Sequence, residues 1–267
     1  MNEGISIERL RRFAEAYVES EKSRIPSGGW WKRPLMVSAS VDERFDALPQ
    51  IAADDHLLPR DLLPSARSVL VFFIPFVRDL VKSNKKGDRP CRDWGVAYVE
   101  TNALIGKIGQ AIADLLAEHG YESGLTPATH NFDEVKLMAR WSHKHLGHLS
   151  NLGRFGVHHL LITPAGCAGR LGSLVTDADL GNHPLIETEE ACLLKAGKSC
   201  GQCIEACPVS AISESGFNRR TCWDRLLENI ELLDDLSDLP GSTQVCGKCA
   251  ALVPCSFKNP VEGLEKR

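Results

Sequence analysis

The chain has 267 residues, of which 43% are hydrophobic and 25% are charged, so it is long enough for one large domain or two modest ones. Its formal net charge of -4 provides no general attraction to nucleic acid or to an anionic membrane. Its apolar runs are all shorter than the ~20 residues that a bilayer span requires, and its charged N-terminus lacks the layout of a signal peptide. The sequence therefore predicts a cytoplasmic protein without a membrane partner.

The chain before residue 185 predicts a mixture of helices and strands. A charged amphipathic pattern indicates a helix over 5–20, and the run SVLVFFIPF at 68–76 indicates a buried strand. Apolar residues at helical spacing predict a helix over 96–119 that stops at Gly120. Further predictions are a polar loop over 83–94, a helix over 133–149, strands over 157–164 and 172–177, and a late helix over 220–236.

Ten cysteines are unusual in a cytosolic chain, because a reducing environment disfavours structural disulfides. Eight of the ten follow residue 190, after a change in composition near residue 185. We therefore expect an α/β domain over 1–185 that holds a cofactor or substrate, packed against a cluster-binding domain over 186–267. Cys91 and Cys167 lie outside the group of eight, and we expect them to be buried small side chains.

The stretch CGQCIEACP contains most of a ferredoxin motif. The four-iron run is C-x2-C-x2-C-x3-C-P, and counting back from Cys207 the first cysteine is missing, because position 197 is glycine. In two-cluster ferredoxins the cysteine before proline serves the other cluster, and we apply the same crossing to Cys255. The eight thiolates then form two sets. We assign Cys192, Cys200, Cys203 and Cys255 to one 4Fe–4S cluster, and Cys207, Cys222, Cys246 and Cys249 to a second.

Zinc is the alternative metal, because zinc sites with four cysteine ligands also use C-x2-C pairs. The continuation CPVSAI is the ferredoxin pattern, whereas zinc ribbons usually carry paired knuckles on both sides. One cluster beside a degraded second is a third reading. The sequence favours two 4Fe–4S clusters as cofactors.

The stretch WSHKHLGHLSNLGRFGVHHLLITPAGCAGRLGSLVTDADL at 141–180 resembles a region of the epoxyqueuosine reductases that reads roughly GLGWIGKNTLLL, followed by a Gly-Ser loop, LGEI and TD. That family also places an eight-cysteine, double-cluster domain after this region, so the resemblance covers roughly 60–267. It implies an α+β fold, with a nitroreductase-like N-terminal domain packed on a ferredoxin-like domain. It also implies a cobalamin cofactor in the N-terminal domain, as in the related reductive dehalogenases.

The resemblance implies where such a cofactor would bind. Glycines in GRLGS would let the backbone approach a large flat ring, since glycine has no Cβ, although a turn between strands also explains them. The matching positions that we expect to bind the cofactor are Gly153, Gly156, His158, Arg170, Gly172, Ser173 and Thr176.

The catalytic candidates depart from the family pattern. The family's Asp-Ser-Ala-Pro segment, whose aspartate is the proposed proton donor, is absent here, and Asp133 is the nearest acid. His143 belongs to a histidine-rich segment that suits proton transfer or substrate contact, with a histidine metal site as the alternative. Tyr98 can line a pocket for a planar ligand, with core packing as the alternative.

Together these features predict an iron–sulfur oxidoreductase. Its two clusters would pass electrons to a cobalamin-like cofactor or a small-molecule ligand, and a low-potential donor such as ferredoxin or flavodoxin would supply them. The alternatives are a non-catalytic electron-transfer protein and a corrinoid-handling protein. We do not expect nucleic acid as a partner, because the net charge is -4 and the helical-repeat tail of the tRNA-acting enzymes has no counterpart after the last cysteine.

Overall fold

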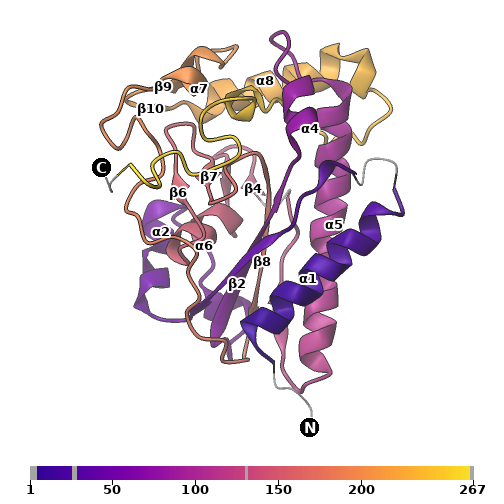
Figure 1. Ribbon diagram of the computed structural model, residues 1–267, viewed down its shortest axis with the longest axis vertical. Helices are drawn as coiled ribbons and strands as arrows, with labels where there is room; N and C mark the ends of the chain where they lie inside the picture. The colour runs from indigo at the N-terminus through magenta and orange to yellow at the C-terminus, as the bar shows by residue number, and fades with distance from the viewer. Residues whose placement is uncertain (1–4, 26–28, 130–131, 265–267) are drawn as a thin grey trace.

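The computed structural model describes residues 5–25, 29–129 and 132–264 (Figure 1). It has an α+β fold, as predicted, around a four-stranded antiparallel sheet in the order β1-β2-β8-β3. Within these ranges, no helix is long and apolar enough to cross a membrane. The elements up to the last sheet strand are α1 (Ile7–Lys22), β1 (Leu35–Ser40), η2 (Glu43–Ala47), α2 (Leu48–Ile51), α3 (Pro59–Leu62), β2 (Ser68–Pro75), α4 (Arg78–Ser83), α5 (Arg92–Ala117), β3 (Ser123–Leu125), β4 (Phe132–Asp133), β5 (Met138–Ala139), α6 (His143–Leu149), β6 (Arg154–Phe155), β7 (Leu161–Ile162) and β8 (Gly169–Thr176).

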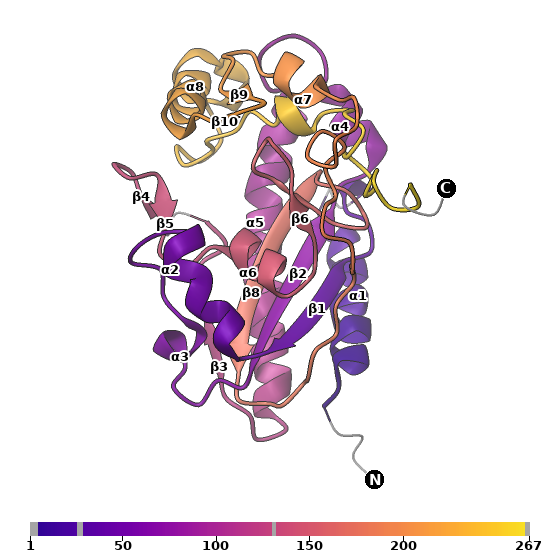
Figure 2. The ribbon, with the colours of Figure 1, turned by 90° about the vertical axis from the view of Figure 1, so that its left-hand side faces the viewer.

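Strand β2, predicted from its apolar run, lies at the centre of the molecule, and all of its residues are buried. Alternate side chains of a strand point to opposite faces of the sheet. Phe72 packs in a core with α1 and α5, whereas Phe73 packs in a second core with α6 and η2. Figure 2 shows α1 and α5 on one side of the sheet and α6 on the other. The sheet is therefore covered on both faces, which explains why this strand is apolar without alternation.

The helices predicted over 5–20, 96–119 and 220–236 correspond to α1, α5 and α8 (Arg219–Leu232). Gly120 follows α5 with a φ of 82°, so it has the left-handed conformation expected of a helix stop. The loop predicted over 83–94 connects α4 to α5, although α5 already begins at Arg92.

The helix predicted over 133–149 is wrong in its first half, where β4 and β5 form a hairpin. The Asp133 carboxylate accepts hydrogen bonds from the backbone N–H groups of Val135 and Lys136, at 2.7 and 2.8 Å, and Leu137 has a φ of 55°. These local bonds form a turn instead of a helix. Among the predicted strands, the one over 157–164 is reduced to β7, and the one over 172–177 is the longer β8.

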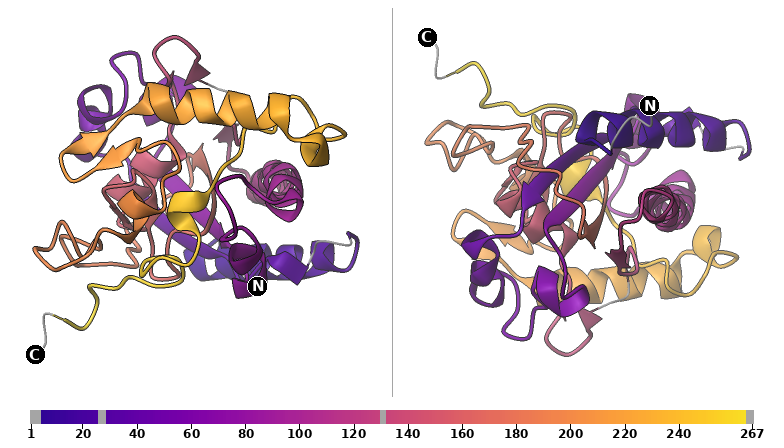
Figure 3. Two further views of the ribbon diagram at one scale, coloured as in Figure 1. Left: turned by 90° about the horizontal axis from the view of Figure 1, so that it is seen from above. Right: turned by 90° about the horizontal axis from the view of Figure 1, so that it is seen from below.

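The cysteine-rich segment covers one end of the sheet and of α5 (Figures 1 and 3). Its elements are α7 (Gln202–Glu205), β9 (Ile212–Ser213), β10 (Gly216–Phe217), α8, η3 (Asp234–Leu236) and η4 (Lys248–Ala250).

The end of the chain pairs with the segment that leads into β8. The N–H groups of Cys167 and Ala168 donate to the carbonyls of Cys255 and Ser256, at 2.9 and 3.1 Å. Gly166 makes this approach possible, since it has a φ of 86° and a Cβ there would lie 2.3 Å from the Ser256 oxygen. The segments before and after residue 185 are thus in direct contact, and their division into two domains stays a prediction.

Candidate metal centres and the adjoining cavity

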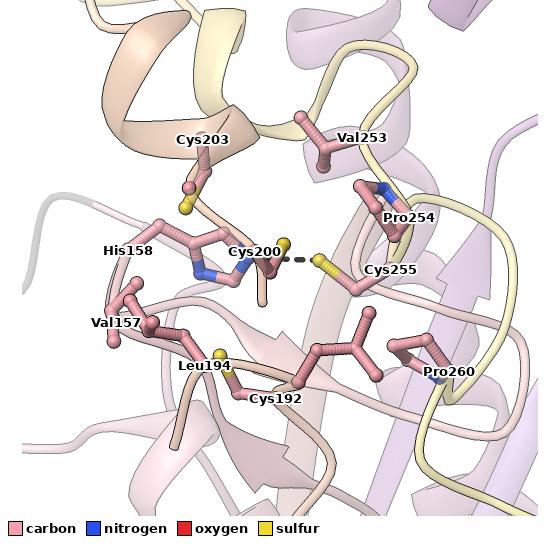
Figure 4. Close-up of a pocket in the computed structure, with 12 residues that line it drawn as sticks. Val157, His158, Cys192, Leu194, Cys200, Cys203, Val253, Pro254, Cys255 and Pro260 are labelled. Carbon is pink, nitrogen blue, oxygen red and sulfur yellow. Dashed lines mark hydrogen bonds between the residues drawn. The ribbon is translucent and has the colours of Figure 1, made fainter. Parts of the chain in front are cut away.

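Pocket one, as we call it, has a volume of about 340 Å³ and lies between α7 and the end of the chain. Cys192, Cys200, Cys203 and Cys255 all line it, and Figure 4 shows their sulfurs around one shared space. These are the four cysteines that the sequence groups in one set. The rest of the wall is mainly apolar, with Val157, Leu194, Val253, Pro254 and Pro260 among its residues.

The loop from Cys192 to Cys200 accounts for the cysteine missing from the motif. Gly197 has a φ of 72°, and within the described ranges no atom would contact a Cβ there, so this glycine serves a turn. The Gly197 N–H donates to the Leu194 carbonyl at 3.0 Å, which closes that turn. The chain can therefore wrap pocket one with Cys192 in place of a residue at 197.

Pocket two contains the other set, Cys207, Cys222, Cys246 and Cys249, and its volume is about 990 Å³. Cys207 follows α7 and lines this pocket while Cys200 and Cys203 line pocket one, as the cysteine crossing in ferredoxins predicts. Gly247 lies between two of these cysteines with a φ of 70°, and a Cβ there would lie 2.3 Å from the Trp94 ring. The wall of pocket two therefore depends on α5, which carries Trp94.

Several of these thiols have raised pKa values in the protein without a bound metal group. Burial and then the neighbouring thiols raise the pKa of Cys203 to about 12 and that of Cys222 to about 11. Burial also raises the pKa of Cys246 and, strongly, that of Cys249. Metal ligands must be thiolates, so a bound cationic group would have to supply the stabilisation that the protein lacks.

Cys255 differs from these thiols because two buried side chains approach its sulfur. His158 Nε2 lies 3.3 Å from the Cys255 Sγ, and the Cys167 S–H donates to it at 3.9 Å. The bond from Cys167 lowers the pKa of Cys255, and so does the bond from His158. In the part of the chain that the structure describes, these are the only three metal-binding side chains whose ligand atoms all lie within 4.8 Å of one another.

Pocket three adjoins pocket two, with a volume of about 790 Å³, and the two share Leu160, Cys167, Gly169 and Arg170. The Arg170 guanidinium lies 4.3 Å from the centre of the Tyr98 ring. Its Nε is buried and has no hydrogen-bond partner among the described residues. Burial lowers the pKa of Arg170. No Asp or Glu of the described chain lines either pocket, so the shared wall carries positive charge.

The structure argues against Asp133 as a proton donor. Asp133 is exposed, it lines none of the pockets above, and its carboxylate is engaged in the hairpin turn. The hydrogen bonds from Lys136 and Val135 lower its pKa, so it is ionised near neutral pH. An ionised carboxylate in a turn has no proton to donate.

His143 lines pocket three, but both of its ring nitrogens are engaged. Its Nε2 lies 3.2 Å from the Pro127 carbonyl, which can only accept, so Nε2 carries the proton. Its Nδ1 therefore accepts from the Ser173 hydroxyl at 2.7 Å, and Ser173 accepts from the Trp141 indole N–H at 3.0 Å. Burial lowers the pKa of His143 to about 4. This histidine is neutral near pH 7, and its two hydrogen bonds tie it to Pro127 and Ser173 in the pocket wall.

The predicted glycine contacts to a flat ring are also corrected. A Cβ on Gly172 would lie 2.5 Å from the Phe72 ring, one on Gly153 would lie 2.6 Å from the Ile162 oxygen, and one on Gly156 would lie 2.5 Å from the His158 ring. These glycines thus pack against the protein itself. Gly172 lies within β8, so the alternative of a turn between strands is wrong there too. Thr176 is fully buried at the other end of β8, where its hydroxyl donates to the Glu122 carbonyl.

Sequence reasoning missed two residues of this region. Cys167 is buried, as predicted, but its contact with Cys255 has no signal in the sequence, because 88 positions separate them. Lys144 lines pocket three, and burial lowers its pKa to about 8. Its place in a histidine-rich segment was visible, but its partial burial was not.

Comparison with known proteins gives structural neighbours. No family model matches the sequence, and no curated protein matches it. The chain is similar to a crystal structure of an epoxyqueuosine reductase, with 18% identity, a TM-score of 0.53, and coverage of 92% of this chain and 66% of that one. For the Bacillus subtilis epoxyqueuosine reductase the identity is 16%, the TM-score is 0.55, and the match covers 92% of this chain and 66% of that one. For an epoxyqueuosine reductase with a tRNA stem loop the identity is 17%, the TM-score is 0.53, and the match covers 90% of this chain and 64% of that one.

This chain therefore spans 66% or less of the length of each of these neighbours. Identities this low establish a shared fold and leave activity to be argued from the site. One neighbour was solved with a tRNA stem loop, so our expectation that nucleic acid is not a partner gains no support from the fold. The chain has the fold of the epoxyqueuosine reductases, in agreement with the resemblance of its sequence.

Proposed function

We propose that this protein is an iron–sulfur reductase with one 4Fe–4S cluster in pocket one, another in pocket two, and an electron acceptor in the adjoining space of pockets two and three. The observation that carries the proposal is that the eight cysteines after residue 190 line two pockets, four in each, with Cys167 as a further cysteine of pocket two. The two pockets are neighbours, since His158 lines both. Clusters bound there would lie close enough for electrons to pass between them.

The spacing of the sulfurs supports clusters over zinc. In a tetrahedral zinc site with Zn–S bonds of about 2.3 Å, the sulfurs lie about 3.8 Å apart. Among the described residues, no three sulfurs of either set lie within 4.8 Å of one another. Four thiolates spread around a cavity suit a group larger than a single ion.

Bound 4Fe–4S clusters supply one-electron transfers at potentials that depend on charge, hydrogen bonds to sulfur and exposure to solvent. The chain supplies the surroundings. Val157, Leu194 and Val253 give pocket one a dry wall, and Gly197 and Gly166 let the chain close around it.

Charge defines the class of acceptor. Arg170 and Lys144 line pocket three without a carboxylate, so we infer that the acceptor is anionic and that Arg170 binds it against Tyr98. Lys144, with a pKa of about 8, can donate a proton near neutral pH, the role that Asp133 and His143 cannot fill. Replacing Lys144 by methionine should slow acceptor reduction about 100-fold. An unchanged rate would remove Lys144 from this role.

Cobalamin is one candidate acceptor, and its fit is incomplete. Of the residues that the resemblance relates to it, His158 and Arg170 line pocket two, whereas Gly153, Gly156 and Gly172 pack against the protein. We therefore derive no step through a corrin ring. The nitroreductase-like and ferredoxin-like arrangement, the electron donor and the reaction itself stay parts of this proposal.

The decisive experiment is anaerobic purification with reconstitution, followed by iron, sulfide and zinc analysis and EPR of the reduced protein. We expect about eight irons and two cluster signals per chain. Stoichiometric zinc without iron would contradict the proposal. Titration with cob(II)alamin then tests the corrinoid. A shifted cobalt signal would support it, and no shift at saturating ligand would leave a small anionic acceptor or plain electron transfer.

A further inference from the structure

Cys255 is the cysteine of pocket one that the N-terminal part of the chain contacts directly. Its sulfur lies 3.3 Å from His158 Nε2 and 3.9 Å from the Cys167 sulfur (Figure 4 shows the first contact as a dashed line). The three side chains are buried, with 8%, 3% and 5% of their surface exposed. Water therefore does not compete for these contacts.

The tautomer of His158 follows from its other ring nitrogen. The Leu160 backbone N–H donates to His158 Nδ1 at 3.1 Å, so Nδ1 is the unprotonated acceptor. In the neutral ring the proton is then on Nε2, which faces the Cys255 sulfur. The ring is also held in place by the close approach of Gly156, where a Cβ would lie 2.5 Å from His158 Cε1. His158 is thus fixed as a hydrogen-bond donor to Cys255.

Cys167 is fixed as a second donor. Its backbone N–H bonds the Cys255 carbonyl at 2.9 Å, so the two residues lie side by side on paired segments. Its S–H donates to the Cys255 sulfur at 3.9 Å. Cys167 also lines pockets two and three but not pocket one. It contacts a ligand of the proposed cluster without being one itself.

We propose that His158 and Cys167 are positioning residues for the cluster in pocket one, which donate hydrogen bonds to the Cys255 sulfur and raise the reduction potential of that cluster. The physical reason is charge. Reduction adds one negative charge to the cluster, and N–H and S–H dipoles directed at a ligand sulfur stabilise the more negative state. This inference rests on the proposed clusters. Cys207 of pocket two accepts a bond from the Ala211 backbone N–H at 3.2 Å, which no side-chain substitution removes, so the second cluster is an internal reference.

The test is an EPR-monitored redox titration of the reconstituted protein and of His158→Phe and Cys167→Ala. The signal that is lost in Cys192→Ala identifies the cluster of pocket one. We expect each variant to keep about eight irons and to shift the reduction equilibrium of that cluster about tenfold toward the oxidised state, which is about 59 mV for one electron. Both side chains also line pocket two but donate to Cys255, so the potential of the second cluster should shift less than that of the first. Cys167→Ser and His158→Gln, which keep a donor, should restore most of the shift.

Cys91→Ala is the matched control, since it removes a cysteine outside both pockets and should leave the potential of the pocket-one cluster unchanged. Unshifted potentials in Cys167→Ala and His158→Phe with full iron would overturn the inference and leave the proposed function standing. One zinc per chain that is lost in His158→Phe would overturn it too, because the three side chains would then bind an ion of their own. A wild-type protein without clusters would overturn both proposals.

Discussion

Pockets one and two each contain four of the eight cysteines that follow residue 190, but they differ in size and in what else lines them, since pocket two is also lined by Cys167. Pocket one, at about 340 Å³, has a wall of proline, valine and leucine, whereas pocket two, at about 990 Å³, also reaches Tyr98, Arg170 and the space of pocket three. Two clusters of equal size would need equal room. If the proposed clusters fill both pockets, the extra space around pocket two is where we propose that the acceptor binds, and pocket one would only store and pass electrons.

The largest expected effect comes from removing one cysteine from each pocket in turn. Cys192→Ala should lose or convert the cluster of pocket one, and Cys222→Ala that of pocket two, because each cluster needs four thiolates. We expect iron to fall from about eight to about four per chain in either variant, measured by iron analysis with EPR.

The comparison of the pockets adds a distinction between these variants. Only Cys222→Ala should change the binding of an acceptor. Cys91→Ala, outside both pockets, should keep all the iron. An iron content of about eight in Cys192→Ala would refute the ligand role of Cys192.

The second prediction uses a glycine substitution that should disturb pocket one and leave pocket two intact. Gly166→Ala would place a methyl group 2.3 Å from the Ser256 oxygen, next to Cys255. Overpacking of this kind destabilises a protein by about 1–3 kcal/mol, in addition to about 1–2 kcal/mol for the left-handed conformation. We expect a lower unfolding midpoint and selective loss of the pocket-one cluster.

Gly120→Ala is the control for the left-handed conformation alone. Gly120 has a φ of 82°, and no atom of the described residues lies within 4 Å of a Cβ there. This variant should lose only the conformational part of the stability and keep both clusters. Equal losses in the two variants would show that the contact of Gly166 with the end of the chain is unimportant.

These two predictions also mark what the sequence could reveal. The grouping of the cysteines was accessible from the C-x2-C pairs and the crossing of the cysteine before proline, and the same groups line the two pockets, whereas their roles as ligands stay predictions. The role of Gly166 was not accessible, because nothing in AGCAG indicates that residues 256 and 257 lie against it. The glycines of GRLGS led to a wrong prediction for the same reason, since a sequence shows that a Cβ is absent but not what occupies its place.

Local chemistry explains the other failure. The helix predicted over 133–149 fails in its first half because the Asp133 carboxylate accepts hydrogen bonds from the backbone N–H groups of Val135 and Lys136 and forms a turn. The resemblance of the sequence to the epoxyqueuosine reductases predicted the fold correctly. The residues that it related to a cofactor belong partly to the packing of β8 against β2, as Gly172 opposite Phe72 illustrates.

The third prediction concerns the wall of pocket three and depends on pH. The pKa of His143 is about 4 in the folded protein, because of burial and the nearby Arg170 and His56, and about 6.5 in the unfolded chain. Between these values the unfolded chain binds more protons, so stability rises with pH and is lost as the pH falls below 6.5. From pH 7.5 to pH 5 we expect His143 to account for about 2 kcal/mol of lost stability.

Urea unfolding of the wild type and of His143→Gln at both pH values isolates this contribution. His145 and His159 also have lowered pKa values, so the wild type loses more than His143 alone explains. The variant should lose about 2 kcal/mol less than the wild type between the two pH values. An identical pH dependence would mean that His143 is not buried as a neutral ring.

The smallest expected effect tests whether pocket two binds an anion. If pocket two has its extra room for an anionic acceptor, small carboxylates and phosphates should stabilise the wild type by about 1.4 kcal/mol at ten times their Kd, measured as a shift of the thermal unfolding midpoint. Arg170→Gln should abolish this shift, because Arg170 lines the pocket beside Tyr98 and is the residue that we propose binds the anion. The variant should keep all the iron, because Arg170 is not a proposed cluster ligand. Arg78→Gln is the matched control, since Arg78 also lies over an aromatic ring, that of Phe257, but lines neither pocket two nor pocket three. Equal stabilisation of Arg170→Gln and the wild type would place the anion elsewhere and leave the size of pocket two without this explanation.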